Sequence, residues 1–210
     1  MPATLISSSS AVSGQTQFGP ADNGRLMTPE EFDAIAPIDV AEGYAYELIH
    51  GVFIVSPFPG PMETDPNDQL GFLLRLYDLH HPNIIDKTVY ETYIRTENGR
   101  RRADRVIWSG LGRVPKWKLD IPTVVIEFLS AGRQSRQRDY DEKRHEYLNL
   151  GVQEYWLFDR FLQRLIVFHR RGGDQVQEIP ATGTYRTPLL PGFELPVGQI
   201  LARAADWTEE

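Results

Sequence analysis

The sequence predicts an α/β fold in which helices pack on a mixed β-sheet and a β-hairpin precedes them. Apolar, β-branched runs are followed by a stretch of helical spacing and then by further apolar runs, an order typical of a mixed sheet covered by helices. Among 210 residues, 41% are hydrophobic and 11% aromatic, which is enough for a substantial core. The length corresponds to one domain, and we place it at residues 27–200.

Both ends of the chain are expected to be tails. Residues 1–26 are rich in Ser, Ala, Gly and Thr, and this composition offers too little apolar surface to offset the entropy of ordering. We also assign residues 201–210 to a C-terminal tail. The first helix is predicted at Thr28-Pro29-Glu30-Glu31, where a capping threonine is followed by proline and, three residues after the cap, by glutamate. It should end near Pro37.

The middle of the chain alternates between strands and helices. Residues 46–55 read as a hairpin that turns at His50-Gly51, because a glycine suits a tight turn. Helices are predicted over 67–80 and 136–150 from apolar residues at helical spacing. Strands are predicted near 88–96, 104–108 and 123–129, a second hairpin at 154–158 and 165–169, and one or two short strands in an otherwise irregular C-terminal part.

Composition excludes several classes of function. The absence of cysteine excludes disulfide scaffolds, cysteine-ligated metals and thiol catalysis, and it fits a cytoplasmic protein. No apolar run approaches the ~18 residues that a membrane span needs, and no secretory signal is evident. A net charge of −7 argues against indiscriminate coating of nucleic acid, but not against a local basic site.

Basic residues gather in the middle of the chain. Residues 95–144 hold 13 Lys or Arg against 7 Asp or Glu, although the whole chain is acidic. These basic residues form two clusters. An ordinary solvated face would explain either cluster alone, whereas two clusters beside the same acidic residues suit the binding of a polyanion next to a metal ion. The expected nucleic-acid contacts are Arg101, Arg102, Arg105, Arg136 and Arg138.

Two acids interrupt apolar strands. Asp104 opens one strand, and Glu127 shares a strand face with Val125 and Leu129. A carboxylate in such a strand costs several kcal/mol unless a cation or hydrogen bonds compensate it. Each could instead lie at the solvent end of its strand and pair with an arginine. Glu47, inside the first hairpin, has the same two interpretations.

Lys143 lies on the helical stripe that should face the sheet, together with Tyr140, Tyr147 and Leu150. A plain (i, i+4) ion pair with Asp139 would also explain this lysine. Mg²⁺ is commonly held by one or two carboxylates, water and phosphate oxygens, so two strand acids and a lysine suggest metal-assisted phosphodiester hydrolysis. Spacing alone does not establish it.

Several segments occur in the order known from one protein family. They are Met27–Phe32, Tyr46–Gly51, Asp104, Ile126–Ser130, Arg138–Lys143, Gly151–Asp159 and Leu190–Phe193. In these segments the chain resembles the Uma2 (Uma-two) family of restriction-endonuclease-like proteins, which belongs to the PD-(D/E)XK nuclease superfamily. The match covers about residues 27–200, and its most specific part is 138–159.

The resemblance implies a restriction-endonuclease-like core with Mg²⁺, or Mn²⁺, at its acidic site. Asp104 and Glu127 match the two metal-binding acids, and Glu47 would be an accessory catalytic acid. Leu129 stands where the superfamily usually has its lysine, and Lys143 on the next helix would replace it. Asn67-Asp68 stands where many members have a histidine.

We therefore expect a Mg²⁺-dependent endonuclease that acts on nucleic acid, with DNA as the first candidate, and a homodimer that brings two sites to a duplex. The alternative is a non-catalytic module on the same fold that binds nucleic acid or associates with itself. A hydrolase of another phosphate compound is a third reading.

Overall fold

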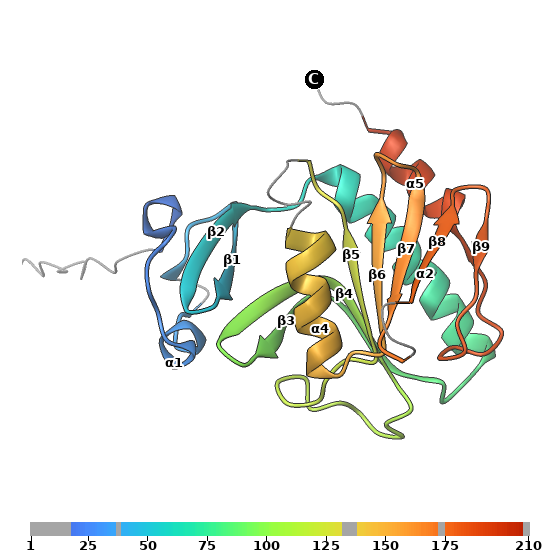
Figure 1. Ribbon diagram of the computed structural model, residues 1–210, viewed down its shortest axis with the longest axis horizontal. Helices are drawn as coiled ribbons and strands as arrows, with labels where there is room; N and C mark the ends of the chain where they lie inside the picture. Colours follow the sequence, from blue (N-terminus) through green and yellow to red (C-terminus); the bar gives the residue numbers. More distant parts are fainter. Residues whose placement is uncertain (1–17, 37–38, 132–137, 172–174, 208–210) are drawn as a thin grey trace, which may run out of the picture.

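The computed structural model describes residues 18–36, 39–131, 138–171 and 175–207. An eight-stranded sheet has the order β2-β1-β4-β5-β6-β7-β8, with β3 paired to β4 (Figure 1). Its strands are β1 (Tyr44–Ile49), β2 (Val52–Pro57), β3 (Ile85–Thr96), β4 (Gly99–Ser109), β5 (Val124–Phe128), β6 (Glu154–Asp159), β7 (Arg164–His169) and β8 (Val176–Pro180). The helices are η1 (Pro20–Asp22), α1 (Pro29–Asp33), α2 (Pro61–His80), the π-helical turn η3 (Arg138–Glu142), α4 (Lys143–Leu150) and α5 (Val197–Ala205), and β9 (Thr184–Tyr185) pairs with β10 (Leu195–Pro196).

The sheet is mixed because β5 and β6 run parallel, while the neighbouring pairs β4–β5 and β6–β7 are antiparallel. A parallel pair requires a crossover connection, and η3 with α4 forms it. The predicted mixed α/β architecture is confirmed.

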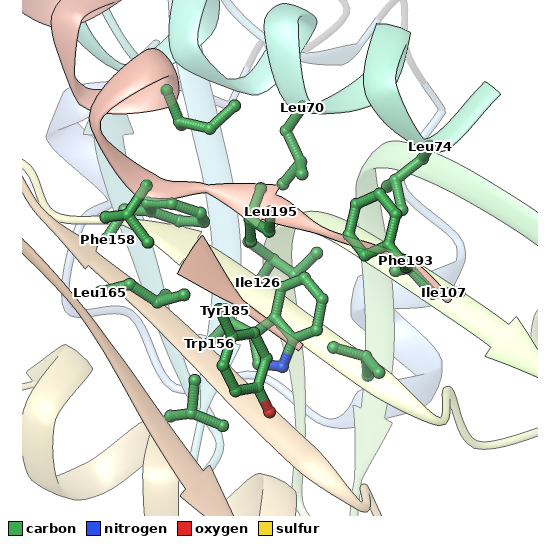
Figure 2. Packing of buried hydrophobic residues seen from close by; sticks show 14 of the residues in the cluster. Leu70, Leu74, Ile107, Ile126, Trp156, Phe158, Leu165, Tyr185, Phe193 and Leu195 are labelled. Carbon is green, nitrogen blue, oxygen red and sulfur yellow. The ribbon is translucent and has the colours of Figure 1, made fainter. Parts of the chain in front are cut away.

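Helices cover both faces of this sheet. Helices α2 and α5 pack on one face, where Leu70 and Leu74 join Ile126 and Trp156 in a large core cluster (Figure 2). Helix α4 covers the opposite face, where Tyr147 packs with Val125 and Leu157. Side chains alternate along β5, so Glu127 points to the α4 face.

Local signals in the sequence produce the expected helix start and hairpin. Thr28 Oγ accepts a hydrogen bond from the Glu31 amide at 3.2 Å, and the Glu31 carboxylate accepts one from the Thr28 amide at 2.7 Å. Between β1 and β2, His50 and Gly51 have φ of 50° and 79°, as a tight turn requires.

Helix α2 begins earlier than the predicted residue 67. Pro61 occupies its first turn, where no backbone N–H is needed, and Glu63 accepts a hydrogen bond from the Gly60 amide at 3.1 Å. Pro66 lies inside the helix and removes one internal hydrogen bond. The predicted start rested on apolar residues at helical spacing, which begin only after this proline.

The boundaries of the predicted tails differ from the structure. Residues 18–26 contain η1 and two bridges, Phe18 with Val40 and Leu26 with Val52. Residues 197–205 form α5, with Leu201 and Ala204 buried. Both assigned tails were therefore too long, whereas residues 1–17 and 208–210 lie outside the described residues. In the described part, no helix is long and apolar enough to cross a membrane.

Candidate active site

Asp104, Glu127 and Lys143 come together in one pocket of about 380 Å³. The register of β4 and β5 pairs Arg105 with Ile126, so Asp104 and Glu127 are the next residues on adjacent strands. Lys143 is the first residue of α4, directly after the π-helical turn. The other charged lining residues are Glu47, Glu63, Arg102, Arg138 and Asp139.

Glu127 is buried and receives two donors on one oxygen. Lys143 Nζ lies 2.8 Å from Glu127 Oε1, and the Tyr147 hydroxyl donates to the same atom at 3.1 Å. Burial, together with the nearby carboxylates of Asp104 and Asp139, raises the pKa of Glu127 well above its usual value, although Lys143 opposes the rise.

Asp104 is half-buried and its carboxylate is held in place. Its Oδ2 accepts a hydrogen bond from the Phe128 amide at 2.7 Å, which ties the side chain of β4 to the end of β5. Burial raises the pKa of Asp104 to about 7, against the opposing effects of Lys143 and the Phe128 amide. Asp104 therefore changes charge near neutral pH.

Lys143 carries its charge in the middle of this pocket. Burial by itself would lower the pKa of Lys143, but the carboxylates of Glu127, Asp139 and Glu47 outweigh it and raise the pKa above its ordinary value. Its Nζ also donates to the Arg102 carbonyl at 3.3 Å. The expected orientation of the α4 stripe toward the sheet is thus found, and the lysine is protonated at neutral pH.

Glu47 enters the pocket from β1. Its Oε1 accepts a hydrogen bond from the Arg102 amide at 3.0 Å, and its Oε2 lies 3.7 Å from Arg138 Nη1. Burial alone would raise the pKa of Glu47, yet the positive charges of Lys143, Arg138 and Arg101 lower it. Glu47 therefore stays ionised more readily than Asp104 or Glu127.

Comparison with known families decides what kind of chain carries this pocket. The model of the family Uma2, described as "Putative restriction endonuclease", matches residues 29–198. The chain belongs to the Uma2 family. The resemblance seen in the sequence is thereby confirmed.

A solved structure has the same fold as this Uma2 chain. It is a protein of Anabaena variabilis whose title calls it a "putative nuclease belonging to DUF820". The two chains are 17% identical, the alignment covers 85% of this chain and 99% of the other, and the TM-score is 0.68. At this identity the likeness concerns the fold alone. No curated protein matches the chain.

Two expected nucleic-acid contacts of the Uma2 chain are structural instead. The Arg101 side chain is only 1% exposed, and its Nε donates to Glu146 at 2.7 Å. Arg105 is buried under α2, where its Nε donates to Asn67 Oδ1 at 2.6 Å. Both guanidinium groups satisfy carboxylate or amide oxygens inside the protein, so they do not reach a phosphate in this conformation.

The other expected arginines have different positions. Arg102 and Arg138 line the pocket beside the acids. Arg102 also pairs with Glu91, whose carboxylate lies on β3. Arg136 lies outside the described residues.

Three further residues contribute to the pocket and were not singled out from the sequence. Asp139 had been considered only as a surface partner of Lys143, but it is buried 3.6 Å from that amine. Glu63 enters from the first turn of α2, and Tyr147 holds Glu127. The π-helical turn decides the position of Asp139, and helical periodicity does not reveal such a turn.

Asn67 positions the strand that carries Asp104. Its amide nitrogen donates to the Asp104 carbonyl at 2.9 Å, while its oxygen accepts from Arg105. The residue that stands at the position of a family histidine therefore fixes α2 against β4.

Asp104 and Glu127 are the two acids that could hold a divalent cation. Oδ1 of Asp139 is buried and has no hydrogen-bond partner among the described residues, although Lys143 Nζ and Arg138 Nε each lie 3.6 Å from it, and the pKa values of Asp104 and Glu127 are both raised. The carboxylate groups that line the pocket therefore outnumber the positively charged side chains that could neutralise them. The described residues include no group of three or more His, Asp or Glu arranged around a metal. Mg²⁺ keeps several waters and needs only one or two carboxylates, so a pair of acids would be enough to hold it.

Proposed function

We propose that this Uma2 chain is a Mg²⁺-dependent endonuclease, able to use Mn²⁺, that hydrolyses phosphodiester bonds in DNA. The observation that carries the proposal is the pair of carboxylates, half-buried Asp104 and buried Glu127, beside a protonated Lys143 in one pocket. Family membership supports a nuclease-like activity. Asp104 and Glu127 would hold the metal, which when bound supplies charge stabilisation at the phosphate and a more acidic water.

The protein's own side chains have separate roles in this proposal. Lys143 is protonated because of its acidic neighbours, so it stabilises negative charge or orients the attacking water instead of accepting a proton. Glu47 is the acid best suited to orient a water, because its pKa is lowered. Arg102 and Arg138 provide positive charge at the pocket wall for a phosphate.

The test is plasmid nicking with Mg²⁺ or Mn²⁺, with EDTA as the first control. Asp104→Asn keeps the shape of the side chain and an acceptor for the Phe128 amide but removes the negative charge. We expect it to lose cleavage by at least about 10²-fold. The matched control is Asp141→Asn, an exposed position on the π-helical turn, which should cleave like the original protein.

Other outcomes would favour the alternatives. Unchanged cleavage in Asp104→Asn would remove this residue from the site. Salt-sensitive binding that EDTA does not alter, without turnover, would indicate a non-catalytic module. Failure to nick plasmid, combined with Mg²⁺ binding that Glu127→Ala abolishes, would indicate another phosphate substrate. The homodimer is tested separately, by light scattering with and without a duplex.

A further inference from the structure

A second cavity adjoins the pocket that contains Asp104, Glu127 and Lys143, which we call the acidic pocket. Its volume is about 490 Å³, and it lies between α1, β1, the β3–β4 pair and residues 117–118. Ala45, Phe58 and Arg102 line both cavities. A chain whose phosphate reached the acids could therefore continue from the first cavity into the second. We call this second cavity the aromatic pocket.

Six of the residues that line it are aromatic. Phe58 and Trp117 are each 52% exposed at its rim, whereas Phe32 and Tyr46 are buried in its wall. The Tyr93 hydroxyl donates to the Tyr46 carbonyl at 2.9 Å, so this part of the wall is fixed. Flat, exposed aromatic rings beside a fixed aromatic wall suit a flat heteroaromatic ligand.

Cations accompany the rim aromatics. The Arg102 guanidinium lies 5.2 Å from the centre of the Phe58 ring, and Lys118 Nζ lies 5.0 Å from that of Trp117. Among the described residues, the charged lining is otherwise Asp33, Arg95 and Arg100, and both arginines pair with the carboxylate of Asp33, at 2.9 and 2.8 Å. Aromatic rings combined with basic groups are the means by which proteins bind single-stranded nucleic acid.

We propose that the aromatic pocket binds an unpaired base of a single strand, next to a phosphate in the acidic pocket. A paired base would have to leave its stack to enter, so the proposal assigns a preference for single-stranded or locally opened substrate. The position of the phosphate rests on the proposed nuclease function. The stacking of the base on Phe58 and Trp117 does not depend on cleavage.

The experiment measures binding without metal. Fluorescence anisotropy in EDTA compares a labelled single strand of about 12 nucleotides with its duplex. We expect the single strand to bind more tightly, and the Phe58→Ala/Trp117→Ala double variant to weaken that binding about 10-fold or more. Trp207→Ala, which removes another exposed tryptophan outside both pockets, is the matched control and should bind normally. Circular dichroism confirms folding of each variant.

A second variant tests the electrostatic contribution. Lys118→Gln should reduce the slope of log affinity against log salt by about 0.7 for a single strand, since one phosphate contact is lost. An unchanged slope would remove Lys118 from the interface and would count against the proposal.

The outcomes separate this inference from the nuclease proposal. Three results would each overturn the proposal that the aromatic pocket binds an unpaired base, even if plasmid were cleaved. They are equal single-strand affinity in the double variant and the original protein, no detectable binding, and tighter binding of the duplex. Loss of single-strand affinity in the double variant would support it, even if the original protein never cleaved. In that case only the nuclease function would fail.

Discussion

Glu127 on β5 and Glu154 on β6 are both buried glutamates on neighbouring strands, yet their surroundings differ. Glu154 points to the α2 face and accepts hydrogen bonds from Trp156 at 2.8 Å, Tyr185 at 2.9 Å and Thr187 at 2.8 Å. His169 lies 3.5 Å away. Its donors are neutral and surround it, so this carboxylate cross-links β6 to the C-terminal segment.

Glu127 instead shares its pocket with Asp104 and Asp139, and its pKa is raised. Burial therefore does not distinguish a site from a structural acid. Both glutamates accept hydrogen bonds, and the difference lies in the additional carboxylates beside Glu127, because competing acids leave a demand for additional positive charge.

The largest effect that we expect is the loss of nucleic-acid cleavage in the Glu127→Gln variant. The amide keeps the volume and an acceptor for Tyr147, but it removes the charge that would hold the metal. We expect a loss of about 10³-fold in plasmid nicking by the folded variant. Retained cleavage would contradict the functional assignment of this glutamate.

Glu154→Ala should behave in the opposite way. The three donors would lose their acceptor in a buried place, so we expect the free energy of unfolding to fall by about 3 kcal/mol. Urea denaturation followed by fluorescence measures it. Plasmid nicking well below the unfolding temperature should persist. Loss of nicking in a folded Glu154→Ala protein would mean that Glu154, like Glu127, is needed for cleavage.

The pH dependence of stability and of cleavage tests the role of Asp104 in the pocket of Glu127. With its pKa raised to about 7, the native state binds a proton that the unfolded state has released, so metal-free stability should fall as pH rises from about 4 to 7. Cleavage should rise over the upper part of this range, because the ionised form is needed for the metal. Melting temperatures and nicking rates across pH check both trends. Asp104→Asn should flatten the stability trend.

The smallest effect is expected at Arg138, which lies at the pocket wall near Glu47. Arg138→Gln should lower nucleic-acid affinity a few-fold and reduce the salt slope by about 1. Arg101→Gln is the comparison, since Arg101 is paired internally with Glu146. It should lower stability and leave the salt slope unchanged, and the reverse pattern would exchange the roles of the two arginines.

Much of the fold was predictable because its signals are local. The capping box at Thr28, the turn at His50-Gly51 and the second hairpin all follow from residues close together in the chain. Helix α5 was also readable, since Val197, Ile200, Leu201 and Ala204 have helical spacing, but we had assigned part of it to a tail. The early start of α2 could not be read from apolar spacing, which begins only after Pro66, a residue whose cost inside a helix must be offset by packing.

The sequence by itself determined which residues could form the site, namely Asp104, Glu127 and Lys143, since acids inside apolar strands and a lysine on an inward stripe are local patterns. Only the tertiary structure decided which charged side chains contact each other. It paired Arg101 with Glu146, buried Arg105 against Asn67, and brought Glu47 next to Arg138. Ion pairs form between residues distant in the chain, and their partners depend on strand register and helix placement, which composition and spacing do not contain.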